Sequence, residues 1–179
     1  KEIIPLKYNN ANFFYDGLAQ VKLNDKWGFI DKTGKEVIPL KYNNAFRFFD
    51  GLALVQLNGK MGFINKSDKE IIPLKYDVAY NFSEDLARVK LNGKYGWIDK
   101  TGKEIIPLKY NYADNLYEGL ARVKLNDKWG FIDKTGKEII PLKYDNAEGF
   151  DDFGLARVKL NGKEGWIEKN GKEFWDKEE

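Results

Sequence analysis

Lys1 to Tyr8 reads Lys-Glu-Ile-Ile-Pro-Leu-Lys-Tyr, and near copies of this octapeptide recur along the chain of 179 residues. The copies begin 34 residues apart, at Lys35, Lys69, Lys103 and Lys137. A fixed period of about 20 to 50 residues is typical of repeat proteins, in which each repeat is one supersecondary unit. We therefore expect a single repeat domain over residues 1–179, with repeats at 1–34, 35–68, 69–102, 103–136 and 137–171 and a C-terminal cap at 172–179.

Each repeat contains the pattern of a β-hairpin followed by a third strand. Leu18 to Leu23 alternates apolar and polar side chains, which is the period of a half-buried strand. Asn24-Asp25 follows, with Asn-Gly in its place in other repeats, and these residues tolerate the positive φ angles of a type I′ turn. Lys26 to Asp31 is then the returning strand. Glu36 to Tyr42 is the third strand, and its Pro39 cannot donate a hydrogen bond, so this strand should end there or lie at a sheet edge.

The segment that connects the third strand to the next hairpin has a different spacing. Its apolar residues Tyr8, Ala11 and Phe14 are three residues apart, which favours a 3₁₀-like turn over a strand. Asp16-Gly17 then reverses the chain, and in the third repeat Asp85 takes the glycine position, which Asp tolerates because it can adopt the left-handed region. The fold class is therefore all-β, with three short antiparallel strands and one 3₁₀-like turn per repeat.

Repeats of this size must stack, because three short strands cannot bury both faces of a sheet alone. An open solenoid or superhelical array and a closed, propeller-like ring of five blades both meet that requirement. The last repeat favours the open array. In Glu173 to Glu179, Asp176 replaces the Pro of the other copies and a charged run replaces Leu-Lys-Tyr, as in a polar cap. Glu164 stands where the other repeats carry Trp, Met or Tyr.

The composition excludes several classes of function. The net charge is only +2 and both signs are scattered through every repeat, so we expect no nucleic-acid partner. The chain contains neither His nor Cys, which removes the commonest general base and the commonest metal ligands. We therefore expect no enzymatic activity, no cofactor and no metal site. No apolar run approaches the roughly 18 residues of a membrane span, and the compartment stays open.

Two repeated positions are candidates for binding. Trp27, Met61, Tyr95 and Trp129 share a position beside a glycine and are large but variable, so they either line a groove for a peptide or sugar or pack between repeats. Arg88, Arg122 and Arg157 share the strand position of Gln20 and Leu54. Arginine is favoured at binding surfaces, although a solvated strand face explains these residues equally well.

Gly93 to Pro107 reads Gly-Lys-Tyr-Gly-Trp-Ile-Asp-Lys-Thr-Gly-Lys-Glu-Ile-Ile-Pro and resembles the bacterial tryptophan-glycine β repeat, also called the WG or KWG repeat. Trp27-Gly28 and Trp129-Gly130 carry the dipeptide itself, and Met61, Tyr95 and Glu164 depart from it. The resemblance covers nearly the whole chain and implies a bacterial module of variable copy number that is usually credited with interaction. It supplies no catalytic residues, and a variable copy number also favours the open array.

The leading hypothesis is a non-catalytic scaffold that binds a protein or peptide. The alternative is a cell-envelope carbohydrate-binding array that stacks sugars on an aromatic column, which Trp27, Tyr95 and Trp129 would form. Exposure distinguishes the two: Trp27, Tyr95 and Trp129 side by side in solvent would favour sugar, whereas burial of all three would favour protein contacts elsewhere.

Overall fold

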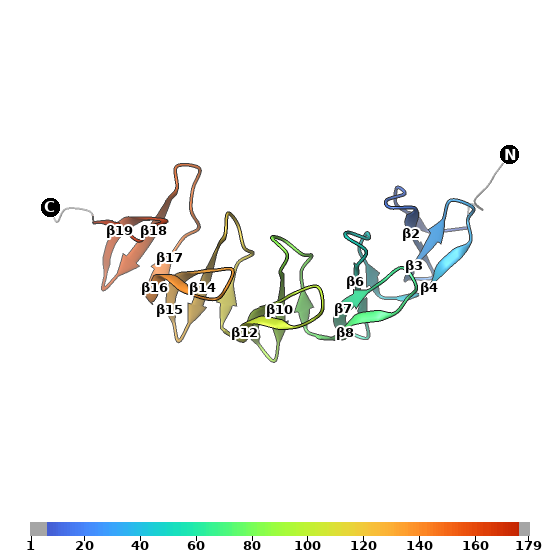
Figure 1. Ribbon diagram of the computed structural model, residues 1–179, viewed down its shortest axis with the longest axis horizontal. Helices are drawn as coiled ribbons and strands as arrows, with labels where there is room; N and C mark the ends of the chain where they lie inside the picture. Colours follow the sequence, from blue (N-terminus) through green and yellow to red (C-terminus); the bar gives the residue numbers. More distant parts are fainter. Residues whose placement is uncertain (1–6, 176–179) are drawn as a thin grey trace. The chain divides into compact units, whose positions relative to one another are not determined.

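The computed structural model describes residues 7–175, which form strands and turns and no helix (Figure 1). Residues 1–6, which open the first repeat, and residues 176–179, which end the predicted cap, lie outside the described part. Because residues 7–175 contain no helix, they also contain none long and apolar enough to cross a membrane. The chain divides into two compact units, Lys1–Asn81 and Phe82–Glu179.

The strands form five four-stranded antiparallel sheets in which strands adjacent in the sequence are neighbours. The strands of unit 1 are β1 (Asn10–Ala11), β2 (Leu18–Leu23), β3 (Lys26–Asp31), β4 (Glu36–Tyr42), β5 (Asn44–Ala45), β6 (Ala53–Leu57), β7 (Lys60–Ile64), β8 (Glu70–Tyr76) and β9 (Val78–Ala79). Those of unit 2 are β10 (Ala87–Leu91), β11 (Lys94–Ile98), β12 (Glu104–Tyr110), β13 (Tyr112–Ala113), β14 (Leu120–Leu125), β15 (Lys128–Asp133), β16 (Glu138–Tyr144), β17 (Asn146–Ala147), β18 (Leu155–Leu160), β19 (Lys163–Glu168) and β20 (Glu173–Trp175).

The connecting segment forms a short strand, so the predicted 3₁₀-like turn is wrong. Ala11 pairs with Val21, and the backbone N–H groups of Asn9 and Asn12 donate to the Lys22 and Gln20 carbonyls at 2.8 and 3.0 Å. The prediction failed because the spacing of three apolar residues in so short a segment is compatible with both a turn and a strand. Each sheet therefore has four strands. In chain order they are the short connecting strand, the two strands of the hairpin and the strand that opens the next repeat, as in β1 to β4.

The predicted hairpin turns are confirmed. Asn24 and Asp25 have φ angles of 48° and 60°, and Asn92 and Gly93 have 50° and 78°, so both central residues of each turn are left-handed. Asp85, which replaces a glycine, also has a positive φ of 67°. The strand that contains Pro39 lies at the edge of its sheet, as predicted, and its pairing with β3 shifts register beside the proline.

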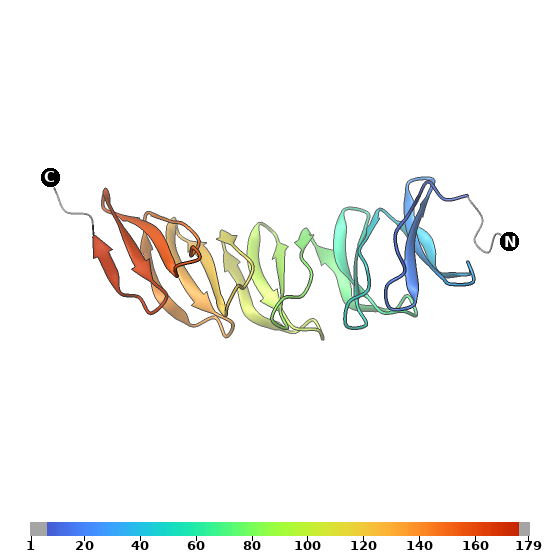
Figure 2. The same cartoon turned by 90° about the horizontal axis from the view of Figure 1, so that it is seen from above.

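The sheets within a unit stack face to face, and the core lies between them (Figure 2). One face of a sheet presents an aromatic side chain, an Ile and a Tyr, such as Phe29, Ile38 and Tyr42. These pack on the Ala and Val residues of the next sheet, such as Ala53 and Val55. Every repeat has an aromatic residue two positions after the Trp27 position, which is typical of a core position. Four of these residues are 1 to 2% exposed and lie in the core, and Trp166 in the last described sheet is 39% exposed; the four are Phe29, Phe63, Trp97 and Phe131.

Candidate interaction surface

The first group of predicted binding residues lies at one point of the fold. Trp27, Met61, Tyr95 and Trp129 are each the second residue of the strand that follows the hairpin turn. All four are half-buried, and Trp27, Tyr95 and Trp129 pack against the hydrophobic cores. They therefore do not form an open aromatic platform in solvent.

In the second group, Arg88 and Arg122 lie between sheets, and the expectation of a solvated strand face is wrong for these two. Gln20 and Arg88 are buried because the next sheet covers this face. Gln20 Nε2 donates to the Ala45 carbonyl at 2.8 Å, Arg122 Nη1 donates to the Ala147 carbonyl at 2.7 Å, and Arg88 donates to the corresponding Ala113 carbonyl. Each of these bonds joins one sheet to the next.

Arg157 differs from the other members of this group. It is exposed in the last described sheet, and its guanidinium pairs with the Glu164 carboxylate. Glu164 occupies the position of Trp129 and its equivalents, so an ion pair replaces the arginine–aromatic contact that the preceding repeats make. The structure therefore does not bring Arg157 together with the other predicted residues.

Unit 2 brings the two groups together as a continuous row of rings and cations. The Arg88 guanidinium lies 5.6 Å from the Tyr95 ring centroid, and Tyr95 is 6.3 Å from Tyr112. Tyr112 is 5.2 Å from Trp129, and the Arg122 guanidinium lies 4.9 Å from the Trp129 ring. We call these five residues the cation–aromatic row. Contacts at these distances combine ring stacking with attraction of a cation to a ring face.

Tyr112 links the two halves of the row, and the sequence predictions missed it. Its Oη donates to the Asp114 carboxylate at 2.8 Å, and Arg122 Nε donates to the same carboxylate at 2.8 Å. The hydrogen bond to Asp114 is the main reason that the pKa of Tyr112 is raised above its usual value. The sequence could have identified Tyr112 by its departure from the repeat, because the equivalent positions hold Asn10, Asn44, Val78 and Asn146.

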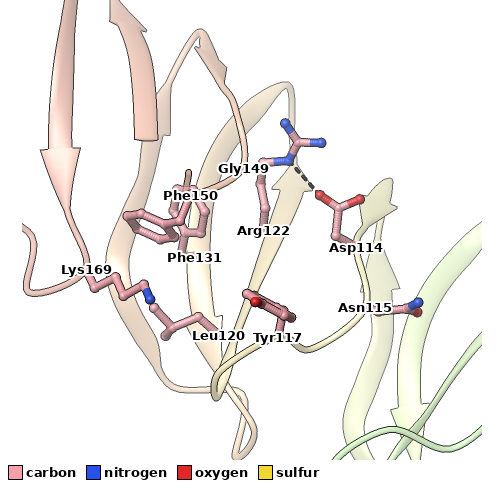
Figure 3. Close-up of a pocket in the computed structure, with 9 residues that line it drawn as sticks. All are labelled: Asp114, Asn115, Tyr117, Leu120, Arg122, Phe131, Gly149, Phe150 and Lys169. Carbon is pink, nitrogen blue, oxygen red and sulfur yellow. Dashed lines mark hydrogen bonds and ion pairs between the residues drawn. The ribbon is translucent and has the colours of Figure 1, made fainter. Parts of the chain in front are cut away.

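A small pocket lies beside the row, between the fourth and fifth sheets (Figure 3). Its volume is about 130 Å³. The Phe131 and Phe150 rings, 4.6 Å apart, form one side, and Arg122 with its partner Asp114 forms another. The remaining lining residues are Asn115, Tyr117, Leu120, Gly149 and Lys169.

Asp31 and its equivalents are the carboxylates that could be considered as a catalytic acid or base, and hydrogen bonds hold them in turns. Asp31 Oδ1 accepts hydrogen bonds from the Thr33 N–H at 2.8 Å, from the Thr33 hydroxyl at 2.6 Å and from the Lys35 N–H at 3.1 Å. The bond from the Thr33 side chain contributes most to the lowered pKa of Asp31. Asp99 and Asp133 repeat this arrangement. A general acid needs a raised pKa, and the pKa of each of these carboxyl groups is lowered. Their hydrogen bonds are instead those of groups that stabilise turns.

Chelation should leave the stability of the protein unchanged. Within residues 7–175, no three acidic side chains converge where they could hold a metal ion. We therefore expect the fold not to depend on an ion that EDTA could remove. The expected result is the same melting temperature with and without EDTA, measured by calorimetry. A fall of more than a few degrees would contradict the prediction.

The repeat pattern matches a known family along nearly the whole chain. The sequence model described as "WG containing repeat" matches residues 1–27, 27–60, 61–95, 95–129 and 129–163. This chain belongs to the WG-repeat family. In its WG repeats, the glycine of the dipeptide sits where β4 or its equivalent passes so closely that no side chain fits, and the preceding aromatic packs at the core edge.

A comparison of the WG repeats with curated proteins finds no match. Solved structures do match. A eukaryotic initiation factor has a TM-score of 0.53 at 9% identity, over 96% of this chain and 55% of that chain. Hsv2 of Kluyveromyces marxianus has a TM-score of 0.52 at 6% identity, over 88% and 57%. BamB from Moraxella catarrhalis has a TM-score of 0.49 at 11% identity, over 90% and 58%.

The initiation factor and the Kluyveromyces marxianus Hsv2 structure are propeller-like, and their likeness to this chain concerns the fold alone. It shows that the WG repeats build small antiparallel sheets of the kind found in propeller blades. The chain spans less than two thirds of the length of each of these proteins.

Proposed function

We propose that this WG-repeat protein is a non-catalytic scaffold that binds a protein or peptide through the cation–aromatic row. The row itself is the observation that carries the proposal. Arginine, tyrosine and tryptophan are the residues most enriched among those that dominate the energy of protein interfaces. In unit 2 they lie in one continuous line, and Tyr112 at its centre is 38% exposed.

The geometry of the rings favours a protein partner over a sugar. The Tyr95 and Tyr112 planes are tilted by 56°, and those of Tyr112 and Trp129 by 59°, so the rings do not present one flat platform. The Arg122 guanidinium also lies over the Trp129 face on which a sugar would stack. The partly exposed Tyr112 ring can instead pack against apolar and backbone groups of a polypeptide.

The non-catalytic part of the proposal rests on chemistry. The chain has no His and no Cys, and the carboxylate considered as acid or base, Asp31, is held by hydrogen bonds in a turn whose equivalents recur. A catalytic site needs groups whose pKa values are pushed apart in one place. Repetition of one environment along the chain supports a structural role for these groups.

We also propose that the repeats form an open array. The support comes from the sequence. Asp176 to Glu179 is charged where the other copies read Pro-Leu-Lys-Tyr, and Glu164 takes the position of a large side chain such as Trp129. Polar substitutions of this kind suit a sheet that no further repeat covers. A ring of five propeller-like blades is the alternative arrangement.

The row can be tested with a substitution copied from the protein's own repeats. Tyr112→Asn introduces the residue found at this position in three other repeats, so the fold accommodates it, and the loss of the ring contacts should lower stability by only about 1 kcal/mol. We expect proteins captured from the source organism by the full chain to be lost with this variant. Capture is measured by affinity purification and mass spectrometry.

Phe49→Ser is the matched control, because Phe49 is a 49% exposed ring outside the row and the third repeat has Ser83 in its place. The control should retain the captured proteins. If Tyr112→Asn captured the same proteins as the unaltered chain, the row would not be the binding surface. Saturable binding to a glycan array, lost with Tyr112→Asn, would support the sugar alternative.

A further inference from the structure

The pocket of unit 2 has a filled counterpart in unit 1. Between the first two sheets, the side chain of Arg47 lies over the ring of Tyr15, with its guanidinium carbon 5.1 Å from the ring centroid. In unit 2, Gly149 takes the position of Arg47, and Tyr117 takes the position of Tyr15. The ring of Tyr117 is 71% exposed, against 43% for Tyr15.

The surroundings of the two sites correspond closely. Phe29 and Phe48 pack 4.9 Å apart in unit 1, where unit 2 has Phe131 and Phe150 at 4.6 Å. A lysine also joins the second sheet to the turn after the tyrosine in both units. Lys66 pairs with Asp16 in unit 1, and Lys169 pairs with Glu118 in unit 2. The feature that unit 2 lacks is the guanidinium over the tyrosine.

The charge of the pocket also suits a guanidinium. Asn12 and Gln20, hydrogen-bonded at 3.0 Å in unit 1, are replaced in unit 2 by Asp114 and Arg122, an ion pair at 2.8 Å. This exchange leaves the sum of charges unchanged. The loop that contributes Phe150 continues with Asp151 and Asp152, both exposed, where unit 1 has one acidic residue, Asp50. An entering cation therefore meets a site at least as favourable as the one around Arg47.

We propose that this pocket binds an arginine side chain of the partner protein, with its guanidinium over Tyr117 as Arg47 lies over Tyr15. The inference rests on the proposed function and adds the chemistry of one contact. A planar, weakly hydrated guanidinium stacks on an aromatic face, whereas a lysine ammonium is compact and strongly hydrated. An arginine delivered by a partner would complete in trans the contact that unit 1 makes within the chain.

The test is an NMR titration of the full chain with N-acetyl-arginine methylamide. We expect saturable shifts centred on Tyr117 and Phe150, with a dissociation constant on the order of tens of millimolar for a single cation–ring contact. The citrulline analogue has the same shape without the charge. It should bind at least roughly tenfold more weakly.

The Gly149→Arg variant provides a second test of the pocket assignment. A Cβ atom at Gly149 would meet nothing within 4 Å, so we expect the fold to tolerate the substitution and the arginine side chain to fill the pocket from within. We expect this variant to lose the shifts at Tyr117 and to keep an otherwise unchanged spectrum. Phe49→Ser, in the other unit, should bind the probe normally.

Equal binding of arginine and citrulline probes, unchanged binding by Gly149→Arg, or no shift at Tyr117 would overturn the pocket assignment. The proposed function is tested separately, by protein capture with the Tyr112→Asn variant. If capture depends on Tyr112 and the arginine probe fails, only the pocket assignment is wrong. If the probe binds at Tyr117 and capture is indifferent to Tyr112, only the binding role of the row is wrong.

Discussion

Gly96→Val is expected to lower the free energy of unfolding by about 3 kcal/mol, at the upper end of the usual cost of overpacking. A Cβ atom at Gly96 would lie 2.6 Å from the Ile106 carbonyl oxygen and 2.8 Å from the Leu108 nitrogen. These are backbone atoms of β12, so the clash can be relieved only by moving a strand away from its partner. Urea unfolding followed by circular dichroism measures the loss.

Gly149→Val is the matched control, because the same substitution there adds a side chain into open space. Lys94→Ala is a second control at the start of the same strand as Gly96. Both should change the free energy of unfolding by no more than about 0.5 kcal/mol. If all three variants unfolded at the same urea concentration, the close approach of β12 to Gly96 would be wrong.

Deleting Leu86 to Gly119 should leave a folded protein that is one repeat shorter. The deletion removes one whole period and joins Asp85 to Leu120, which recreates the two-residue turn that now joins Ser83 to Leu86. Units that contact only their neighbours can lose one member and remain stacked. In the open array that we propose, X-ray scattering should show a longest dimension smaller by about one fifth.

The control deletion, Leu86 to Gly102, removes half a period and leaves β12 without its partner β11. We expect it to abolish cooperative folding, because unpaired strand edges promote association. Aggregation of the whole-period deletion would favour a closed ring instead, since a ring that loses one member exposes its edges. An unchanged longest dimension would reject the open array.

The local structure of each repeat was predictable because single residues determine it. Asn92-Gly93 requires a left-handed turn, Pro107 cannot donate from the middle of a sheet, and Gly96 marks a place where a side chain is excluded. These are covalent and steric properties of the residues themselves. The two-residue strand Asn10–Ala11 escaped prediction because its conformation depends on pairing with β2, which no local pattern specifies.

The position of Arg88 could not be predicted from its own strand. An alternating pattern shows which residues share a face, but burial of the second face depends on the neighbouring sheet. Stacking buries Arg88 and supplies the Ala113 carbonyl as its partner. The pocket was harder still, because it results from the absence of a side chain at Gly149. The pocket can be interpreted only by comparison with unit 1, where Arg47 covers Tyr15.

Photo-crosslinking from position 112 tests most directly whether the cation–aromatic row binds a protein. Replacing Tyr112 with p-benzoyl-phenylalanine keeps an aromatic ring in the row, and the same replacement at Phe49 places the probe on an exposed site outside it. In extracts of the source organism, we predict a discrete polypeptide crosslinked to position 112 and not to position 49. Identical crosslinked proteins from the two positions, or none from position 112, would contradict it.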